Sequence, residues 1–351
     1  MSKPLDPARL LARLEKNGNP LIEADAAMFV WKGTAAPHLI CDLYDWEENP
    51  RPLRRLTDDL YALRLPLPAD TYLEYAFFDP ATGQRVRDPF NPRRIWNGVG
   101  QYNHYVYMPA AAPSPLTRRD PAARRGEVTR HEIPADDLTA GRKRLVHLYQ
   151  PPTDDPVPLL VVYDGNDYLR RGRITVIVDN LIAQRRIRPL ALALVPNGGP
   201  TRMVEYACSE ATLGFILQTV LPLARRQMRL VDPARQPGAY GVLGASMGGL
   251  MAVYTALRLP HIFGRVISQA GAFELGDYET VVVQMVRHLP PPPVQFWLDV
   301  GRMDFLRQAN RRMAALLEER GYSLTYLETG GAHNYTTWRN VLGEALTALF
   351  G

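Results

Sequence analysis

The chain has only two cysteines, four lysines and no long apolar run. Cys41 and Cys208 lie far apart in the sequence and show neither metal-ligand nor redox spacing, so we expect buried thiols in a reducing compartment. No stretch approaches the ~18 continuous apolar residues of a membrane span, and the N-terminus lacks the apolar core of a signal peptide. These absences predict a cytoplasmic protein with no membrane partner.

The basic residues are arginines in large excess over lysines, and the formal net charge is +5. They are scattered as short pairs, such as Arg118-Arg119 and Arg185-Arg186, without a long basic tract containing interleaved aromatic residues. A nucleic-acid partner is therefore not expected. Arginine suits planar anions such as carboxylates and phenolates, although a coding habit of the genome is the better explanation of the excess.

The first third of the chain is rich in short candidate strands separated by turn residues. Before them, Asp6-Pro7 is typical of a capped helix start, and Asn17–Pro20 ends that helix. The alternation of apolar and polar residues predicts an Ig-like β-sandwich. We expect the N-terminal helix and sandwich to occupy residues 1–115, a linker 116–125 and a second domain 126–351. The candidate strands are Met28–Trp31, Leu39–Leu43, Leu60–Leu65, Tyr72–Phe77 and Tyr105–Tyr107.

In the second domain, apolar strands alternate with helical patterns. Leu159–Tyr163 and Leu190–Val195 are continuous apolar runs, as is typical of parallel strands that are buried on both faces. Val128–Ile133 and Lys143–Tyr149 predict a hairpin. This alternation predicts an α/β protein with a doubly wound, mostly parallel sheet. The predicted helices are Thr175–Ala183, Thr212–Arg226, Leu250–Leu257, Gln308–Arg320 and Trp338–Leu349.

The most informative motif is Gly244-Ala245-Ser246-Met247-Gly248. It lies between the apolar run Tyr240–Leu243 and an apolar helical pattern that starts at Leu250. A Gly-x-Ser-x-Gly at a strand-to-helix junction is the nucleophile elbow of serine hydrolases, because the small flanking residues allow a sharp turn that exposes the serine hydroxyl. Ser246 is therefore the predicted nucleophile. The alternative is a glycine-rich turn that packs a helix onto a strand.

A serine nucleophile needs a histidine base that is oriented by an acid. His333 follows the candidate strand Leu324–Glu328, at the strand end where ligands gather in such sheets. His261 and His288 also follow Ser246, but they lie in a helix-to-strand connection and before a proline run. The alternative interpretation of His333 is an ordinary loop histidine without a catalytic role.

The acid is predicted from the same strand ends. Asp304 follows the strand Val294–Val300 and is our choice to orient the histidine. Glu274, one strand earlier, is the rival, whereas Asp299 lies within the strand and is expected to be structural. A helix-capping role is the alternative for Asp304.

An oxyanion hole needs two N–H donors, one of them from the residue after the nucleophile, here Met247. The second is expected from the loop after the strand that ends at Tyr163, and we choose Gly165 and Asn166. The alternative for this loop is a simple turn. The mechanism that these residues predict requires neither a metal nor an organic cofactor.

Taken together, these segments resemble the enterochelin (enterobactin) esterases, a branch of the α/β hydrolases. The resemblance covers nearly the whole chain, since Asp88–Pro92 also matches the Asp-Pro-x-Asn-Pro signature of that family's sandwich domain. Thr219 and Asn334 depart from the family, which usually has glutamate and aspartate there. The matching segments of the second domain are Val161–Gly165, Arg202–Tyr206, Val220–Pro222, Gly244–Gly249, Gly301–Asp304, the glycine-rich loop around His333, and Trp338-Arg339.

The resemblance implies a small-molecule ester substrate, which is a catecholate siderophore of the enterobactin type or its iron complex. Because a ferric tris-catecholate is a trianion, Arg202 and Arg302 are candidate substrate contacts, although Arg202 could instead pair internally with Glu205. Feruloyl, carbohydrate and other carboxylic esters are alternative substrates. A non-catalytic glycan-binding protein on a hydrolase scaffold is the alternative of another class. The sequence leaves open whether two copies form a homodimer.

Overall fold

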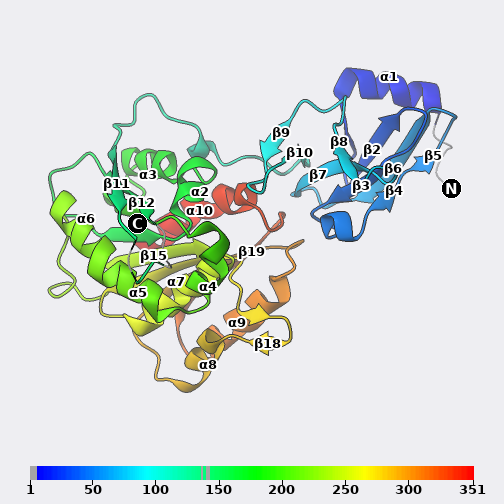
Figure 1. The fold of residues 1–351 in the computed structure, drawn as a ribbon. Helices are drawn as coiled ribbons and strands as arrows, with labels where there is room; N and C mark the ends of the chain where they lie inside the picture. The colour runs from blue at the N-terminus through cyan, green and yellow to red at the C-terminus, as the bar shows by residue number, and fades with distance from the viewer. Residues whose placement is uncertain (1–5, 136, 140–142) are drawn as a thin grey trace. The chain divides into compact units, whose positions relative to one another are not determined.

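The computed structural model describes residues 6–135, 137–139 and 143–351 (Figure 1). The chain divides into two compact units. Unit 1 comprises Met1–Ala112 together with the short segments Arg302–Asp304 and Thr329–Asn334. Unit 2 comprises Pro113–Gly301, Phe305–Glu328 and Tyr335–Gly351.

Unit 1 contains two antiparallel sheets that share one hydrophobic core. Phe29 and Leu65 from the first sheet pack in the same buried cluster as Leu39, Tyr75 and Val106 from the second. The first sheet has the order β1-β2-β6-β5 and the second β4-β3-β7-β10-β9, with β8 also paired to β7. The strands are β1 (Leu21–Ile22), β2 (Ala26–Lys32), β3 (His38–Cys41), β4 (Arg51–Pro52), β5 (Arg54–Arg55), β6 (Leu60–Pro66), β7 (Tyr72–Asp79), β8 (Gln84–Val86), β9 (Arg94–Trp96) and β10 (Tyr102–Tyr107).

The helix α1 (Pro7–Asn17) begins as the sequence predicts. The Asp6 carboxylate accepts the N–H groups of Ala8 and Arg9, and Pro7 needs no acceptor at the first helical position. Leu10 and Leu14 are the buried positions of the helix, and they pack with Met28 and Val30 in a second cluster, on the face of the first sheet opposite the shared core.

Unit 2 is built on an eight-stranded mixed sheet with the order β11-β12-β14-β13-β15-β16-β19-β20. The predicted hairpin is confirmed, because β11 and β12 pair antiparallel. From β14 to β19 the neighbouring strands are parallel. The strands are β11 (Glu127–Ile133), β12 (Arg144–Gln150), β13 (Leu159–Val162), β14 (Ala191–Leu194), β15 (Tyr240–Ala245), β16 (Phe263–Gln269), β19 (Gln295–Gly301) and β20 (Ser323–Thr329), and a separate small hairpin consists of β17 (Glu274–Leu275) and β18 (Tyr278–Glu279).

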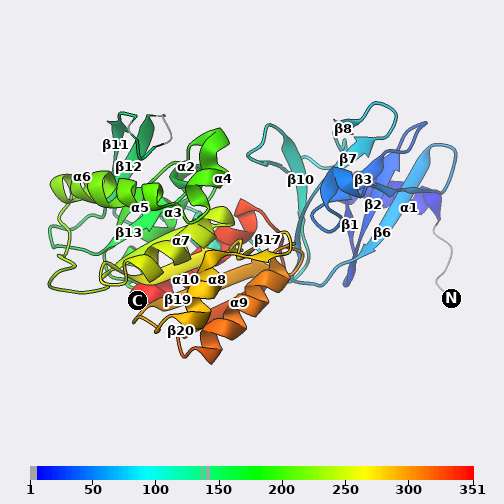
Figure 2. The ribbon, with the colours of Figure 1, turned by 60° about the horizontal axis from the view of Figure 1, so that its bottom comes forward.

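Two separate hydrophobic clusters cover the sheet of unit 2. The helices α3 and α10 contribute to one cluster, and α5 to α9 contribute to the other. Within the second group, α8 and α9 lie side by side (Figure 2). The helices are α2 (Gly165–Arg170), α3 (Ile174–Ala183), α4 (Arg202–Tyr206), α5 (Glu210–Phe215), α6 (Leu221–Gln227), α7 (Met247–Arg258), α8 (Val281–His288), α9 (Arg307–Glu319) and α10 (Tyr335–Phe350).

One predicted helix is interrupted. Between α5 and α6, residues Ile216–Val220 form a π-helical turn instead of continuing the α-helix. Pro222 lacks an N–H and cannot complete the bonding ladder in the next turn, which accounts for the irregular turn just before it.

Candidate active site

Ser246 is the junction between β15 and α7. Its backbone is at φ 58° and ψ −124°, a conformation that costs a non-glycine residue about 1–3 kcal/mol and tends to occur at functional sites. Backbone bonds fix the turn: the Ser246 N–H donates to the Gln269 carbonyl at 2.9 Å, and the Ser246 carbonyl accepts the Ala272 N–H at 3.1 Å. From Tyr240 to Ala256, Ser246 alone is not buried.

The glycines around Ser246 are required by close packing. A Cβ on Gly244 would overlap the backbone of Gly248, and a Cβ on Gly249 would come within 2.6 Å of the Ser268 Oγ. The Gly-x-Ser-x-Gly-Gly pattern therefore lets β15 and α7 approach closely enough to leave only the serine side chain partly exposed. This is the backbone arrangement that the elbow motif predicts.

Two short helices start beside the predicted oxyanion donors. Met247 is the first residue of α7, where an N–H has no acceptor inside the helix. Gly165 begins α2, but its N–H donates to the Val195 carbonyl at 2.8 Å. Of the two residues chosen in this loop, Asn166 is therefore the better candidate donor, because the Gly165 N–H is already bonded to the residue that follows β14.

Arg202 is bonded to the same loop. Its Nε and one terminal nitrogen donate to the two carboxylate oxygens of Asp164 at 2.8 and 2.6 Å, and the guanidinium also donates to the Ala245 carbonyl at 3.3 Å. Burial opposes the charge, but the hydrogen bond and charge of Asp164 outweigh it and raise the pKa of Arg202. Asp164 is itself buried and accepts a further bond from Asn197 at 2.5 Å. Arg202 thus links the loop after β13 to the residue before Ser246.

The alternative pairing of Arg202 with Glu205 is wrong. Glu205 instead accepts bonds from the buried Arg144 and from Thr201. Arg302, the other candidate substrate contact, forms an ion pair with Asp70 at 2.5 Å within unit 1. That hydrogen bond lowers the pKa of Asp70. Both predicted substrate arginines therefore have protein carboxylates as partners.

His333 and Asp304 are in direct contact. The Nδ1 of His333 lies 2.9 Å from the Oδ2 of Asp304, whose side chain is fully buried, whereas the histidine side chain is 24% exposed. Asp304 follows β19 and His333 follows β20, which neighbour each other in the sheet. A buried carboxylate on Nδ1 fixes the tautomer that leaves Nε2 to accept a proton.

The rival acids are engaged elsewhere. Glu274 forms a two-point ion pair with Arg312 at 2.6 and 2.5 Å. Asp299 accepts the side-chain N–H groups of Trp297 and Gln269 at 2.8 and 2.9 Å, and this is the structural role expected for it.

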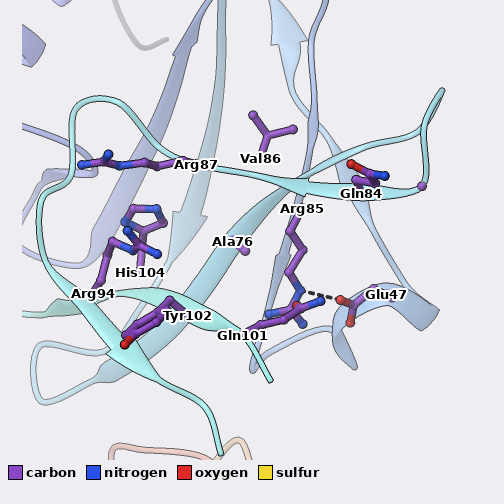
Figure 3. A pocket seen from close by; sticks show the side chains of 11 residues that line it. Glu47, Ala76, Gln84, Arg85, Val86, Arg87, Arg94, Gln101, Tyr102 and His104 are labelled. Carbon is purple, nitrogen blue, oxygen red and sulfur yellow. Dashed lines mark hydrogen bonds and ion pairs between the residues drawn. The ribbon is translucent and has the colours of Figure 1, made fainter. Parts of the chain in front are cut away.

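A cavity of about 430 Å³ lies in unit 1, and none of the residues that line it is predicted to be catalytic (Figure 3). Along β7, residues up to Tyr75 pair with β10 and residues from Phe77 onward pair with β8. Ala76 lies between these two paired stretches and lines the cavity. Arg85 lines this cavity and pairs with Glu47 at 2.6 Å. Its second nitrogen donates to the Asn103 side chain at 2.7 Å.

In the described ranges 6–135, 137–139 and 143–351, no group of three or more His, Cys, Asp or Glu residues could hold a metal ion. In the same ranges, no single helix is long and apolar enough to cross a membrane. The segments Gly199–Tyr206 and Glu210–Gln227 meet the length and composition test only as a pair, across a 101° bend.

A family model described as "Putative esterase" matches residues 138–349. The chain belongs to this esterase family. Among curated proteins, it is 25% identical to an iron(III) enterobactin esterase of Escherichia coli K12 over 277 residues, which cover 76% of this chain and 68% of the relative. It is 28% identical to an iron(III) salmochelin esterase of Escherichia coli O6:H1 over 333 residues, which cover 84% and 78%.

Solved structures of two enterobactin esterases share the fold of this esterase. The protein from Salmonella typhimurium superimposes with a TM-score of 0.81 at 20% identity, covering 97% of this chain and 98% of that one. The Shigella flexneri protein, crystallised in the presence of enterobactin, gives a TM-score of 0.75 at 20% identity with 92% of both chains covered. The chain is thus an enterochelin esterase-like carboxylic ester hydrolase with an α/β-hydrolase-type fold.

Two features of the site were missed by the sequence analysis. Asp164 holds Arg202, and Asn334 donates its side-chain N–H to Asp42 at 3.2 Å within unit 1. The departure at Asn334 from the family pattern was a signal for the second feature. The sequence contained no signal for Asp42, the partner of Asn334, because the two residues are distant in the chain.

Proposed function

We propose that this chain is a serine esterase that hydrolyses catecholate siderophore esters of the enterobactin type through an acyl-enzyme. The single observation that carries the mechanism is the His333–Asp304 contact at 2.9 Å, with the acid fully buried. The positive φ of Ser246 at the β15–α7 junction supports its role as the nucleophile. The names of the relatives, iron(III) enterobactin and salmochelin esterases, support the substrate class.

In the first half of the proposed reaction, the Ser246 Oγ attacks the ester carbonyl carbon while the Nε2 of His333 takes the hydroxyl proton. Asp304 keeps the Nδ1–H in place and stabilises the imidazolium. The N–H groups of Met247 and Asn166 hold the negative oxygen, and one such donor is typically worth about 2.7–4 kcal/mol in the transition state. His333 then protonates the departing alcohol, which leaves an acyl-serine.

In the second half, His333 removes a proton from water, whose oxygen attacks the acyl carbon. Collapse of the second tetrahedral intermediate returns the proton to the Ser246 Oγ and releases the acid. Neither a metal nor an organic cofactor enters these steps. Iron enters only as part of the substrate.

We also assign the two sheets of unit 1 to an Ig-like β-sandwich domain.

A fluorophosphonate probe tests the nucleophile. We expect wild-type protein to gain the mass of one adduct on Ser246 and Ser246→Ala to gain none. If folded wild-type protein is not labelled, the hydrolase mechanism is wrong.

A substrate panel tests specificity separately from the nucleophile. Initial rates are compared for ferric and iron-free catecholate tri-lactones, feruloyl sugar esters and acetylated sugars. We expect the highest kcat/KM for a tri-lactone. A preference for the sugar esters would replace the siderophore assignment while leaving the serine mechanism in place.

A further inference from the structure

The loop that carries His333 is bonded at both ends to unit 1, at one end to β7 and at the other to the residue that follows β3. This His loop consists of residues Gly330–Asn334. At its start, the Gly330 carbonyl accepts the Tyr72 N–H at 2.9 Å, and a Cβ on Gly330 would overlap the Asp70 carbonyl. At its end, the Asn334 side chain donates to the Oδ2 of Asp42 at 3.2 Å. His333 is the residue immediately before this second anchor.

The acid beside His333 is tied to the same loop. The Arg302 N–H donates to the Thr329 carbonyl at 2.9 Å, and the Met303 N–H donates to the Gly331 carbonyl at 3.1 Å. The residues before Asp304 are therefore bonded to the His loop at Gly331 and to Thr329, the residue just before that loop. Movement of the loop would change the geometry of the His333–Asp304 contact as well as the position of the imidazole.

Asp42 is a fixed anchor because its own position is bonded on several sides. Its Oδ2 also accepts the Glu74 N–H at 2.8 Å, and its own N–H donates to the Glu74 carbonyl at 3.2 Å. The Trp46 side chain provides a further hydrogen bond. Strand β7, which contains Glu74, runs through the middle of its sheet between β3 and β10. Asp42 is thus bonded to the central strand of the sheet.

A buried network continues behind Asp42. The Glu74 carboxylate accepts the Tyr72 hydroxyl at 3.0 Å and the Asn103 side-chain N–H at 2.7 Å. Asn103 in turn accepts a bond from Arg85, at the wall of the cavity in Figure 3. Glu74 and Asn103 are 4% and 3% exposed. An unbroken chain of polar contacts therefore runs from Arg85 to Asn334.

The charge of Asp42 is compatible with a position close to the catalytic acid. Burial, and then the negative charges of Glu74 and Asp304, raise the pKa of Asp42 well above its usual range. A protonated carboxyl as well as an ionised one can accept the Asn334 N–H on Oδ2, so the anchoring bond does not depend on which form is populated. An amide at position 334 suits this neighbour because it brings a donor without another acid.

We propose that Asp42 is a positioning residue for catalysis. It acts through the side chain of Asn334 and holds the imidazole of His333 at hydrogen-bonding distance from the Asp304 carboxylate. This inference depends on the proposed role of His333 as the base. It gives the first 112 residues a catalytic purpose, since their sheet supplies the anchor for the loop that carries the base. In this proposal Asp42 acts on the position of the base and takes no part in the chemistry.

The test is a double-mutant cycle on kcat with two further variants. Asp42→Ala and Asn334→Ala each remove the same hydrogen bond and should each lower kcat about ten- to hundredfold, while KM stays within about twofold, because a shift of about 1 Å in a catalytic group is enough for such a loss. The double variant should be no slower than the slower single variant. Asp42→Asn keeps an acceptor for Asn334 and should stay within about fivefold of wild type. The surface control Asp58→Ala should not change kcat.

Wild-type kcat in Asp42→Ala, or losses that multiply in the double variant, would overturn the proposal. A fall in the thermal midpoint with kcat intact would assign Asp42 a purely structural role and would also overturn it. If Asp42→Ala does not fold, two variants still test the proposal: Asn334→Ala removes the same bond from the other partner, and Asp42→Asn keeps it. Failure of the proposed function is distinguishable, since wild-type protein would then show no fluorophosphonate adduct on Ser246, whatever the Asp42 variants do.

Discussion

The Nδ1 of His333 lies 2.9 Å from the Oδ2 of Asp304, whose side chain has no exposed surface. Because a buried carboxylate opposite Nδ1 selects one tautomer, Asp304→Asn should lower kcat by roughly 10⁴ with little change in stability. Steady-state hydrolysis of an activated ester and urea unfolding measure both effects. Glu274→Gln is the matched control and should retain activity. A large loss in Glu274→Gln with little in Asp304→Asn would transfer the acid role to Glu274.

Arg202→Lys should lower kcat about tenfold without a comparable rise in KM. A lysine cannot make the two parallel bonds that Arg202 gives Asp164, so the loop that contains Asn166 loses its connection to the residue before Ser246. Arg311→Lys changes a partly exposed pair on Glu328 and should leave kcat unchanged. If Arg202→Lys instead raises KM with kcat unchanged, Arg202 contacts the substrate directly.

Gly244→Ala should destabilise the protein by at least about 3 kcal/mol, since the added Cβ would overlap the backbone of Gly248 and force β15 away from α7. Gly83→Ala is the control: its Cβ meets open space, so only the positive φ of 69° is penalised, by about 1–2 kcal/mol. Urea unfolding gives both values. Equal losses in the two variants would show that the elbow tolerates the extra atom.

The stability contribution of Glu328 should depend on pH in a defined direction. Hydrogen bonds from Arg311, Tyr326 and Arg307 lower the pKa of Glu328 to about 2 against the opposing effect of burial. An acid whose pKa is lower in the folded protein than in the unfolded chain stabilises the fold fully above the unfolded pKa, here about 4.3. This stabilisation disappears as the pH falls through the folded pKa of about 2.

The variant Glu328→Gln measures that contribution. At pH 7 it should be less stable than wild type by about 1 kcal/mol, because solvent around the partly exposed arginines screens the interaction. The difference should shrink steadily below pH 4. Glu318→Gln, which changes an exposed residue of α9, serves as the control and should not lower the stability at pH 7. A difference that stays constant from pH 7 to pH 2 would contradict the assignment.

The sequence predicted those parts of the molecule that local chemistry dictates. The Gly-x-Ser-x-Gly pattern located the β15–α7 turn because only small residues allow those backbones to approach. Apolar runs located β13 and β14 because strands that are buried on both faces need them. The π-helical turn before Pro222 was not predicted, since the residues that form it have ordinary helical patterning.

Partners that are distant in the chain could not be predicted. Arg202 was expected to contact the substrate or Glu205, yet the structure pairs it with Asp164. The N–H of Gly165 was chosen as a donor, but the Val195 carbonyl accepts it. Neither sequence segment reveals such a competing partner. The roles of Ser246, Met247, Asn166, Asp304 and His333 stay predictions until the labelling and kinetic experiments are done.

The unusual backbone of Ser246 has a consequence for the stability of this enzyme. Glycine adopts a positive φ at lower cost than serine, so Ser246→Gly should be inactive by the proposed mechanism and yet more stable than wild type. The conformation of residue 246 is thus a stability cost that comes with the proposed nucleophile.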